Sequence, residues 1–248
     1  MRYSEYTTTN IQLDEDMDRR GFLRGMLGAG AIAAGLRPDD AEAAQKKKAV
    51  PGKTAQRIQS VVQPPKKITP EESRGGHSPQ ELKAYVEAMA QKYVPPEQRA
   101  QFIGQIAHET ANFTSMIEQN PEKNIKHYAK PGNPLGNKGL EDAWKYIGRG
   151  FLQITGKYNY KHFGDKIRQG LGDELLSNPN MAMRKDVAIA LAVMFWRERV
   201  APKIAAGASN KEISKAINGK KPKGLKSREK FVNQAAAQNP SQVKKVWR

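Results

Sequence analysis

The stretch Gln105-Ile106-Ala107-His108-Glu109-Thr110-Ala111-Asn112-Phe113 places a carboxylate at the end of an apolar helical pattern. Just before it, apolar residues recur at the spacing of a helix that buries one face, namely Phe102, Ile103, Ile106 and Ala107. Glu109 follows this face directly, so we expect its carboxyl group to be partly withdrawn from water. Withdrawal from water favours the protonated form and suits a general acid. Taken alone, the segment fits a glutamate at a frayed helix end better than it fits a general acid.

Helical patterns dominate the chain on both sides of this stretch. Ser78-Pro79-Gln80-Glu81 predicts a helix start, with serine as the N-cap and glutamate closing a capping box. A strongly apolar period from Val187 to Trp196 predicts a buried helix after the Asn178-Pro179 turn. Strand signals are confined to residues 150–155. The expected fold is mainly α, with a small β element.

The composition of the chain excludes several classes of protein. The longest apolar stretch, residues 25–36, has 12 residues, whereas a membrane-spanning helix needs about 20. Because the chain has no cysteine, it has no disulfide scaffold, cysteine zinc site or thiol nucleophile. The four histidines lack the close pairing typical of metal sites, so we expect neither a metal nor another cofactor.

The first 43 residues carry the pattern of an export signal. Arg19-Arg20-Gly21-Phe22-Leu23-Arg24 precedes the short apolar stretch, and Ala41-Glu42-Ala43 follows as a cleavage site. This order predicts a twin-arginine signal over residues 1–43, with delivery to the periplasm or the exterior. The alternative is a basic turn that opens a short buried helix.

The charge of the chain predicts a polyanionic partner. The formal net charge is +17, and it becomes +20 when residues 1–43 are removed. Residues 44–77 are rich in Lys, Pro, Gln and Gly, and we interpret them as a disordered basic linker. The linker is either a plain solvated tail or a tether to an anionic surface. The catalytic domain is expected over residues 78–248.

A second segment, residues 146–160, gathers groups that suit a carbohydrate cleft. Glycines flank Arg149, so a ligand can approach the backbone closely. Gln153, Thr155 and Asn159 supply amide and hydroxyl groups, and three tyrosines supply flat faces for sugar rings. A glycine-rich hairpin with one polar face is the structural alternative.

From about residue 78 onward, the chain resembles glycoside hydrolase family 19, the chitinases and related endolysins of lysozyme-like fold. The resemblance rests on several motifs in order: Ala107-His108-Glu109-Thr110, Tyr146 with Gly148-Arg149-Gly150, Gln153-Ile154-Thr155-Gly156, Asn159-Tyr160, the Asn178-Pro179 helix ending in Phe195-Trp196, and Ile217-Asn218-Gly219 with Arg228 downstream. It implies a lysozyme-like α+β fold, with a helical bundle and a small β element beside the cleft.

The resemblance also implies roles for individual residues. Glu109 matches the general acid, Glu118 the most favoured general base, and Thr155 the residue that helps to hold the attacking water. The matches for substrate contacts are Tyr146, Arg149, Gln153, Asn159, Asn218 and Arg228. The implied mechanism is inverting, with carboxyl groups about 6.5 to 9.5 Å apart.

The chain departs from the family pattern in two places. The loop from Glu118 to Gly148 is shorter than in many relatives, so Glu122 and Glu141 stay open as the base. Ala111-Asn112 stands where two glycines are common.

These observations favour a monomeric peptidoglycan hydrolase that cleaves β-1,4 bonds between N-acetylated sugars of the cell wall. Uncharged chitin would not explain the excess of basic residues, although a chitinase is the first alternative. A non-catalytic wall-binding or virion-associated protein is the second alternative. A specific nucleic-acid partner is not expected, because the basic residues form no recognition helix or RNA-binding motif.

Overall fold

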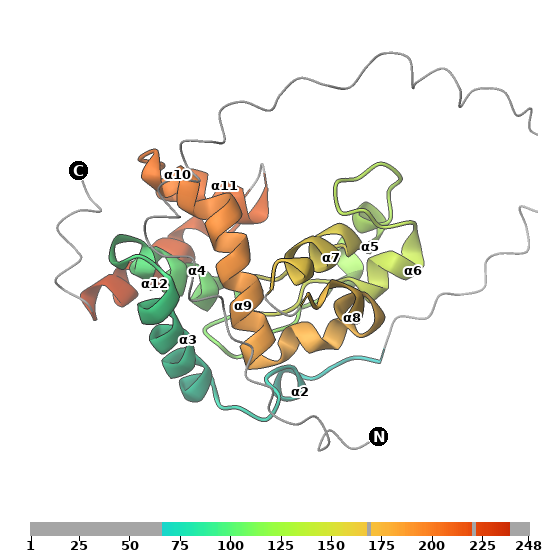
Figure 1. Cartoon of the computed structure of the whole chain (residues 1–248), viewed down its shortest axis with the longest axis horizontal. Coiled ribbons are helices and arrows are strands. Elements are labelled where there is room, and N and C mark those ends of the chain that lie inside the picture. The colour runs from blue at the N-terminus through green and yellow to red at the C-terminus, as the bar shows by residue number, and fades with distance from the viewer. Residues whose placement is uncertain (1–65, 168–169, 220–221, 239–248) are drawn as a thin grey trace, which may run out of the picture. The chain divides into compact units, whose positions relative to one another are not determined.

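The computed structural model describes residues 66–167, 170–219 and 222–238 (Figure 1). The expected export signal with Arg19 and Arg20, and most of the expected linker, lie outside the described residues. The described elements are α2 (Pro70–Ser73), α3 (Pro79–Tyr93), η2 (Pro96–Gln98), α4 (Arg99–Glu109), α5 (Glu122–Tyr128), α6 (Leu140–Lys145), α7 (Lys157–Asp165), α8 (Gly172–Ser177), η3 (Pro179–Met183), α9 (Lys185–Phe195), the π-helical turn η4 (Trp196–Val200), α10 (Ala201–Ala205), α11 (Asn210–Asn218) and α12 (Leu225–Ala237).

Helix α9 forms the centre of the described core. Every residue from Val187 to Phe195 is buried, and α9 contacts both α3 and α7. Figure 1 shows α9 between α3 and α4 on one side and α7 and α8 on the other. Trp196 continues the apolar run, packs edge-to-face on Phe102 at 5.2 Å between ring centroids, and donates to Gln98 Oε1 at 2.9 Å. The prediction of a buried helix here is confirmed.

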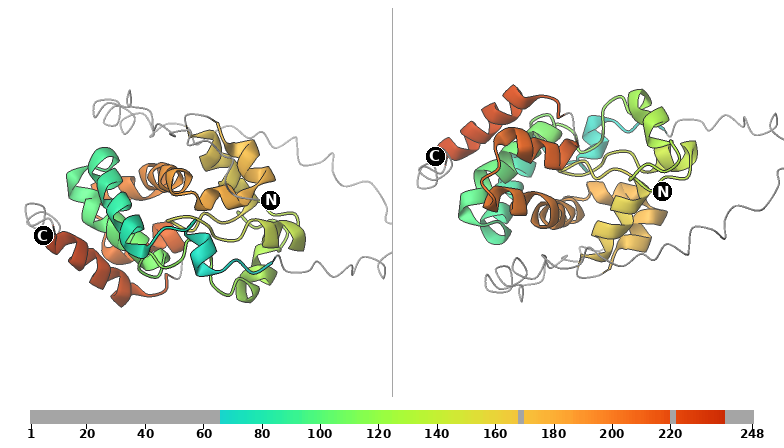
Figure 2. Two further views of the ribbon diagram at one scale, coloured as in Figure 1. Left: turned by 90° about the horizontal axis from the view of Figure 1, so that it is seen from below. Right: turned by 90° about the horizontal axis from the view of Figure 1, so that it is seen from above.

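Helices α4 and α12 pack closely against each other, although they lie far apart in the sequence. Both views in Figure 2 show α12 alongside the α3–α4 region. Gly104 permits this approach, because a Cβ atom at that position would lie 2.6 Å from the backbone of Val232. The close packing brings the first turns of α12 to the end of α4, where Glu109 lies.

The β element is smaller than expected. It consists of two isolated bridges in the described residues, one between Ile117 and Arg149 and one between Arg149 and Ile154. The chain reverses between these residues because Gly150 and Gln153 adopt left-handed backbone conformations, with φ of 79° and 51°. The reversal replaces an extended strand by a tight loop. The mainly α-helical class is confirmed, and none of the described helices has the length and hydrophobicity to cross a membrane.

The boundary expected at residue 77 is wrong, because residues before it fold against the domain. Helix α2 begins with a capping box between Thr69 and Glu72. Ser73 is fully buried, and its hydroxyl accepts a hydrogen bond from the Met116 amide at 3.1 Å. Arg74 donates to the Thr114 carbonyl oxygen at 2.6 Å. These contacts hold the segment that leads to Glu118.

Ser73→Ala is therefore expected to lower the free energy of unfolding by about 1–3 kcal/mol, because the buried Met116 amide loses its acceptor. Denaturant unfolding would measure the change. Ser177→Ala is the matched control, since the Ser177 hydroxyl is exposed and donates only to the Glu174 carbonyl within its own helix. Equal stability of the two variants would contradict the role given to Ser73.

Candidate active site

Glu109 ends helix α4 in a nearly dry environment. Its side chain is 11% exposed, and that of its partner Arg228 is 1% exposed. Arg228 donates through Nη2 to Glu109 Oε1 and through Nη1 to Gln105 Oε1. Burial raises the pKa of Glu109, and the charge and hydrogen bond of Arg228 oppose that increase without cancelling it.

Asn218, at the end of α11, completes the contacts around Glu109. With the amide nitrogen facing the carboxyl group, Asn218 donates to Glu109 Oε1 at 3.2 Å and its oxygen accepts from Arg228 Nη2. Both donors therefore address the same carboxyl oxygen. Helices α4, α11 and α12 each supply one residue of this cluster.

His108 precedes Glu109 but adds no charge to it near neutral pH. Burial and the nearby Arg228 charge lower the pKa of His108 to about 4. Its Nδ1 lies 3.1 Å from the Ser227 hydroxyl. His108 therefore links α4 to α12 as a neutral side chain.

The chain turns sharply after Glu109 with strained backbone. Ala111, Asn112 and Phe113 have φ values of 48°, 60° and 64°. Such values cost free energy in residues with a Cβ atom and persist where surrounding contacts enforce them. Here the Thr110 hydroxyl accepts from the Phe113 amide at 2.9 Å. This turn lets the chain run back toward Glu118.

Glu118 lies in a polar setting that contrasts with that of Glu109. Its Oε1 accepts hydrogen bonds from Asn124 Nδ2 at 2.7 Å and from the Tyr128 hydroxyl at 2.9 Å. Its Oε2 accepts from the Gly148 amide at 3.1 Å. Burial and the Glu118 charge raise the pKa of Tyr128, so its hydroxyl stays a donor. All three contacts use the carboxyl oxygens of Glu118 as acceptors.

Gly148 is the point at which the polar residues converge. A Cβ atom there would lie 2.8 Å from Gln153 Oε1, 3.1 Å from Thr155 Oγ1 and 3.3 Å from Glu118 Cβ. The Thr155 hydroxyl donates to the Gln153 carbonyl oxygen at 2.8 Å. Its lone pairs are therefore the part of this hydroxyl that another molecule can use. The structure thus brings Glu118, Gln153 and Thr155 together.

Tyr146 and Arg149, which the resemblance matches to substrate contacts, have buried side chains. They are 2% and 4% exposed. The Arg149 guanidinium donates to the carbonyl oxygens of Lys145 and Ile147 and to Asn180 Oδ1. Buried backbone carbonyl groups need hydrogen-bond donors, and the Arg149 guanidinium supplies them to the turn of residues 145–149.

Asn159 is 9% exposed and uses both ends of its amide within the protein. Its Nδ2 donates to the Thr155 carbonyl oxygen at 2.7 Å, and its Oδ1 accepts from Arg199 Nη2 at 2.8 Å. Glu122 and Glu141, the open candidates for the base, lie exposed in the first turns of α5 and α6.

Sequence reasoning missed several residues that hold the site, namely Gln105, Asn124, Tyr128 and Arg199. Asn124 and Tyr128 are four residues apart, which places them on one face of α5. This spacing was a usable signal for a shared partner. Within the described ranges, no group of three or more His, Cys, Asp or Glu residues could hold a metal ion.

Comparisons of the sequence with known proteins place this chain in a family. The family model described as "Chitinase class I" matches residues 89–213. A glycosyl hydrolase family 19 domain-containing protein of Haemophilus influenzae is 30% identical over 149 residues, covering 49% of this chain and 70% of that protein. An acidic endochitinase of Petunia hybrida is 34% identical over 98 residues, covering 39% of this chain and 34% of that protein.

Among solved structures, chitinase C from Streptomyces griseus aligns with a TM-score of 0.47 and 21% identity, covering 68% of this chain and 73% of that chain. The chain thus spans about a third of the plant protein named above and most of the bacterial one. The family model covers half of the chain, and the bacterial relative aligns over most of its own length. The chain therefore belongs to glycoside hydrolase family 19 and is a glycosidase.

Proposed function

We propose that this glycosidase hydrolyses β-1,4 bonds between N-acetylated sugars of bacterial peptidoglycan with inversion at the anomeric carbon. The observation that carries the proposal is the contrast between two carboxyl groups. Glu109 is largely withdrawn from water and has a raised pKa, whereas Glu118 accepts three hydrogen bonds. A carboxyl group that is withdrawn from water is suited to act as the acid, and one that accepts several hydrogen bonds is suited to act as the base.

Glu109 is the proposed general acid. Because Arg228 and Asn218 both donate to Oε1, the proton resides on Oε2. From there it passes to the glycosidic oxygen as the C–O bond breaks. Arg228 stabilises the carboxylate that forms, and Gln105 in turn holds Arg228.

Glu118 is the proposed general base for the attacking water. Two side-chain donors occupy Oε1, whereas the Gly148 amide alone contacts Oε2, so Oε2 is better placed to take the proton. Thr155 helps to hold the water through the lone pairs of its hydroxyl. We assign Gln153 and Asn218 to contacts with the N-acetyl sugars.

This assignment predicts the alkaline limb of the pH profile. Activity is lost as pH rises through the raised pKa of Glu109, because the acid must be protonated. Arg228 lowers that pKa, so Arg228→Gln is expected to move the limb of kcat/KM to higher pH, alongside a loss of rate. Lys226→Gln, on an exposed residue of the same helix, should leave the limb in place. A shift of the limb to lower pH in Arg228→Gln would contradict the assignment.

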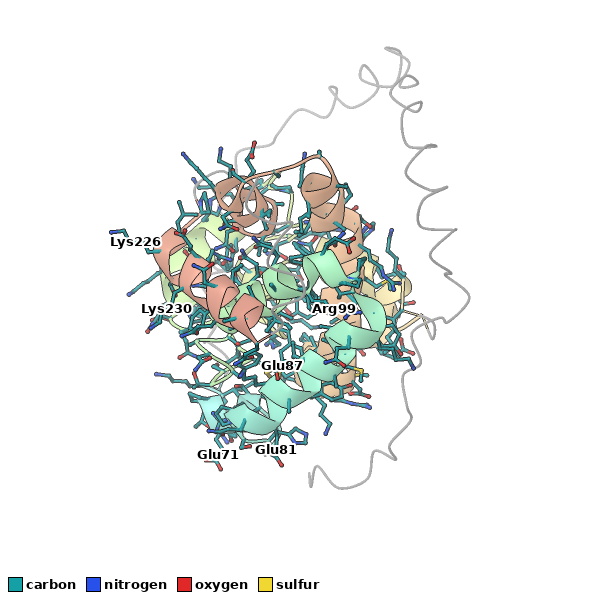
Figure 3. The ribbon with its side chains drawn as sticks, turned by 90° about the vertical axis from the view of Figure 1, so that its left-hand side faces the viewer. Glu71, Glu81, Glu87, Arg99, Lys226 and Lys230 are labelled. Carbon is teal, nitrogen blue, oxygen red and sulfur yellow. The ribbon has the colours of Figure 1, made fainter. Side chains whose placement is uncertain are left out.

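The basic surface favours peptidoglycan over chitin. In the described residues from α10 to α12, six lysines are exposed against two glutamates: Lys203, Lys211, Lys215, Lys223, Lys226 and Lys230 against Glu212 and Glu229. Figure 3 shows Lys226 and Lys230 projecting outward from α12. Peptide carboxylates and envelope phosphates are attracted to such a surface, whereas chitin has no charge.

Chitin is the second candidate substrate, because several relatives are named endochitinases. Parallel digestion of purified peptidoglycan and of chitin by the full chain tests the choice. Faster release of soluble fragments from peptidoglycan, with a difference that shrinks as salt is added, is the expected result. Release from chitin with negligible release from peptidoglycan would overturn the peptidoglycan assignment.

We also propose export by the twin-arginine route on the basis of Arg19-Arg20 and the apolar stretch that follows. Replacement of Arg19-Arg20 by two lysines should trap the precursor inside the cell. Unchanged export would contradict the proposal. A non-catalytic wall-binding role is disfavoured, since burying the Glu109 carboxyl group has a free-energy cost that a binding protein does not need.

A further inference from the structure

We infer that Arg199 is a positioning residue that sets the loop of residues 153–156 by orienting the Asn159 amide at the start of α7. The inference rests on the proposed function, in which this loop presents Gln153 and Thr155 to substrate and water. Arg199 itself contacts protein groups, and its effect passes through Asn159. Two hydrogen bonds separate its guanidinium from the Thr155 carbonyl group.

The guanidinium of Arg199 is held in place by aromatic rings. It lies 4.9 Å from the ring centroid of Phe163 and 5.2 Å from that of Phe195. Phe163 belongs to α7, and Phe195 ends α9. Contacts of this kind restrict a planar cation in both position and tilt. Arg199 therefore offers its Nη2 in a defined direction.

Asn159 lies between this fixed donor and the loop. An asparagine amide can face either way, and the two orientations exchange its donor and its acceptor. Because a guanidinium has donors and no acceptor, Arg199 requires the amide oxygen on its own side. The amide nitrogen then faces the Thr155 carbonyl group, which is 2.7 Å away. Arg199 thereby fixes the orientation that holds Thr155.

The charge of Arg199 is not needed to neutralise its neighbour Glu198. Glu198 already contacts Lys166 Nζ at 2.7 Å and His162 Nε2 at 2.8 Å, whereas Arg199 Nε is 4.0 Å away. The shorter and better-aligned contact of Arg199 is the one to Asn159. This difference assigns Arg199 to the loop and leaves the Glu198 cluster as a separate surface ion-pair group.

A double-mutant cycle in the full chain tests the inference. Arg199→Ala is expected to lower kcat/KM by about 10- to 100-fold, since small displacements of positioned groups have effects of this size. Asn159→Ala should give a similar loss, and the double variant should lose no more than Asn159→Ala alone. Arg199→Lys, which keeps a charge and a donor, should recover part of the activity.

Arg99→Ala is the matched control, because Arg99 donates to the backbone carbonyl groups of Gln91 and Val94 on the face shown in Figure 3, whereas Arg199 donates to the Asn159 side chain. This variant should lose stability without losing kcat/KM. If the fold-loss of kcat/KM in the double variant equals the product of the losses in the Arg199→Ala and Asn159→Ala single variants, the inference is overturned. Parental activity of Arg199→Ala would overturn it too.

A readout independent of catalysis separates this inference from the proposed function. The side-chain amide protons of Asn159, followed by NMR, should exchange slowly in the parent and faster in Arg199→Ala and Arg199→Lys. Equal exchange in parent and variants would overturn the positioning role even if the enzyme is active. A parent that cleaves neither polymer but shows the exchange difference would overturn the proposed function and support the positioning role.

Discussion

Glu109→Gln is expected to lower kcat by about 10²- to 10⁴-fold, the range typical for removal of a general acid. Glutamine keeps the shape of the side chain and an oxygen that can accept from Arg228. It has no proton to give to the leaving oxygen. Since the acid acts in the transition state, kcat and kcat/KM should fall together.

Initial rates on peptidoglycan would measure this effect, with the unfolding free energy determined for the same preparations. Glu229→Gln is the matched control, because Glu229 is exposed and adjoins Arg228 in α12. The control should retain parental kcat. If Glu109→Gln retains parental kcat while folded, Glu109 is not the acid.

Glu118→Gln is expected to have the second large effect, a fall of about 10²- to 10⁴-fold in kcat. The amide cannot accept a proton from water. Its NH₂ group would also face at least one hydrogen-bond donor, either the Gly148 amide or both Asn124 and Tyr128. Tyr128→Phe removes only one donor and should have a smaller effect.

Glu122→Gln and Glu141→Gln complete this test, because the sequence leaves both glutamates as alternative candidates for the general base. Their exposed positions predict parental rates for both variants. A large loss in either variant, with Glu118→Gln nearly unaffected, would reassign the base. Product analysis by NMR should show the anomer opposite to that of the cleaved bond.

Sequence patterns predicted the parts of the fold that depend on local periodicity. The capping box at Ser78 and the buried helix up to Phe195 are confirmed. Both follow from short-range rules, since a cap and an apolar helical face are written in consecutive residues. The placement of Glu109 at the end of a buried helix follows from the same pattern.

The supporting contacts could not be predicted in the same way. A glycine-flanked arginine fits an exposed ligand contact and a buried support equally, and only the three-dimensional structure shows that Arg149 is buried. Arg199 lies 40 residues from Asn159 in the chain, so no local spacing joins them. The sequence pattern predicted that residues 70–77 belong to a linker. It could not show otherwise, because Ser73 accepts its hydrogen bond from the amide of Met116, which is distant in the sequence.

The most direct measurement is the identification by mass spectrometry of new reducing ends in purified peptidoglycan treated with the full chain or its Glu109→Gln variant. We predict new reducing N-acetyl sugar ends from the parent protein and at most a trace from the variant. No new ends from either protein, or equal amounts from both, would contradict a peptidoglycan glycosidase that uses Glu109 as its acid.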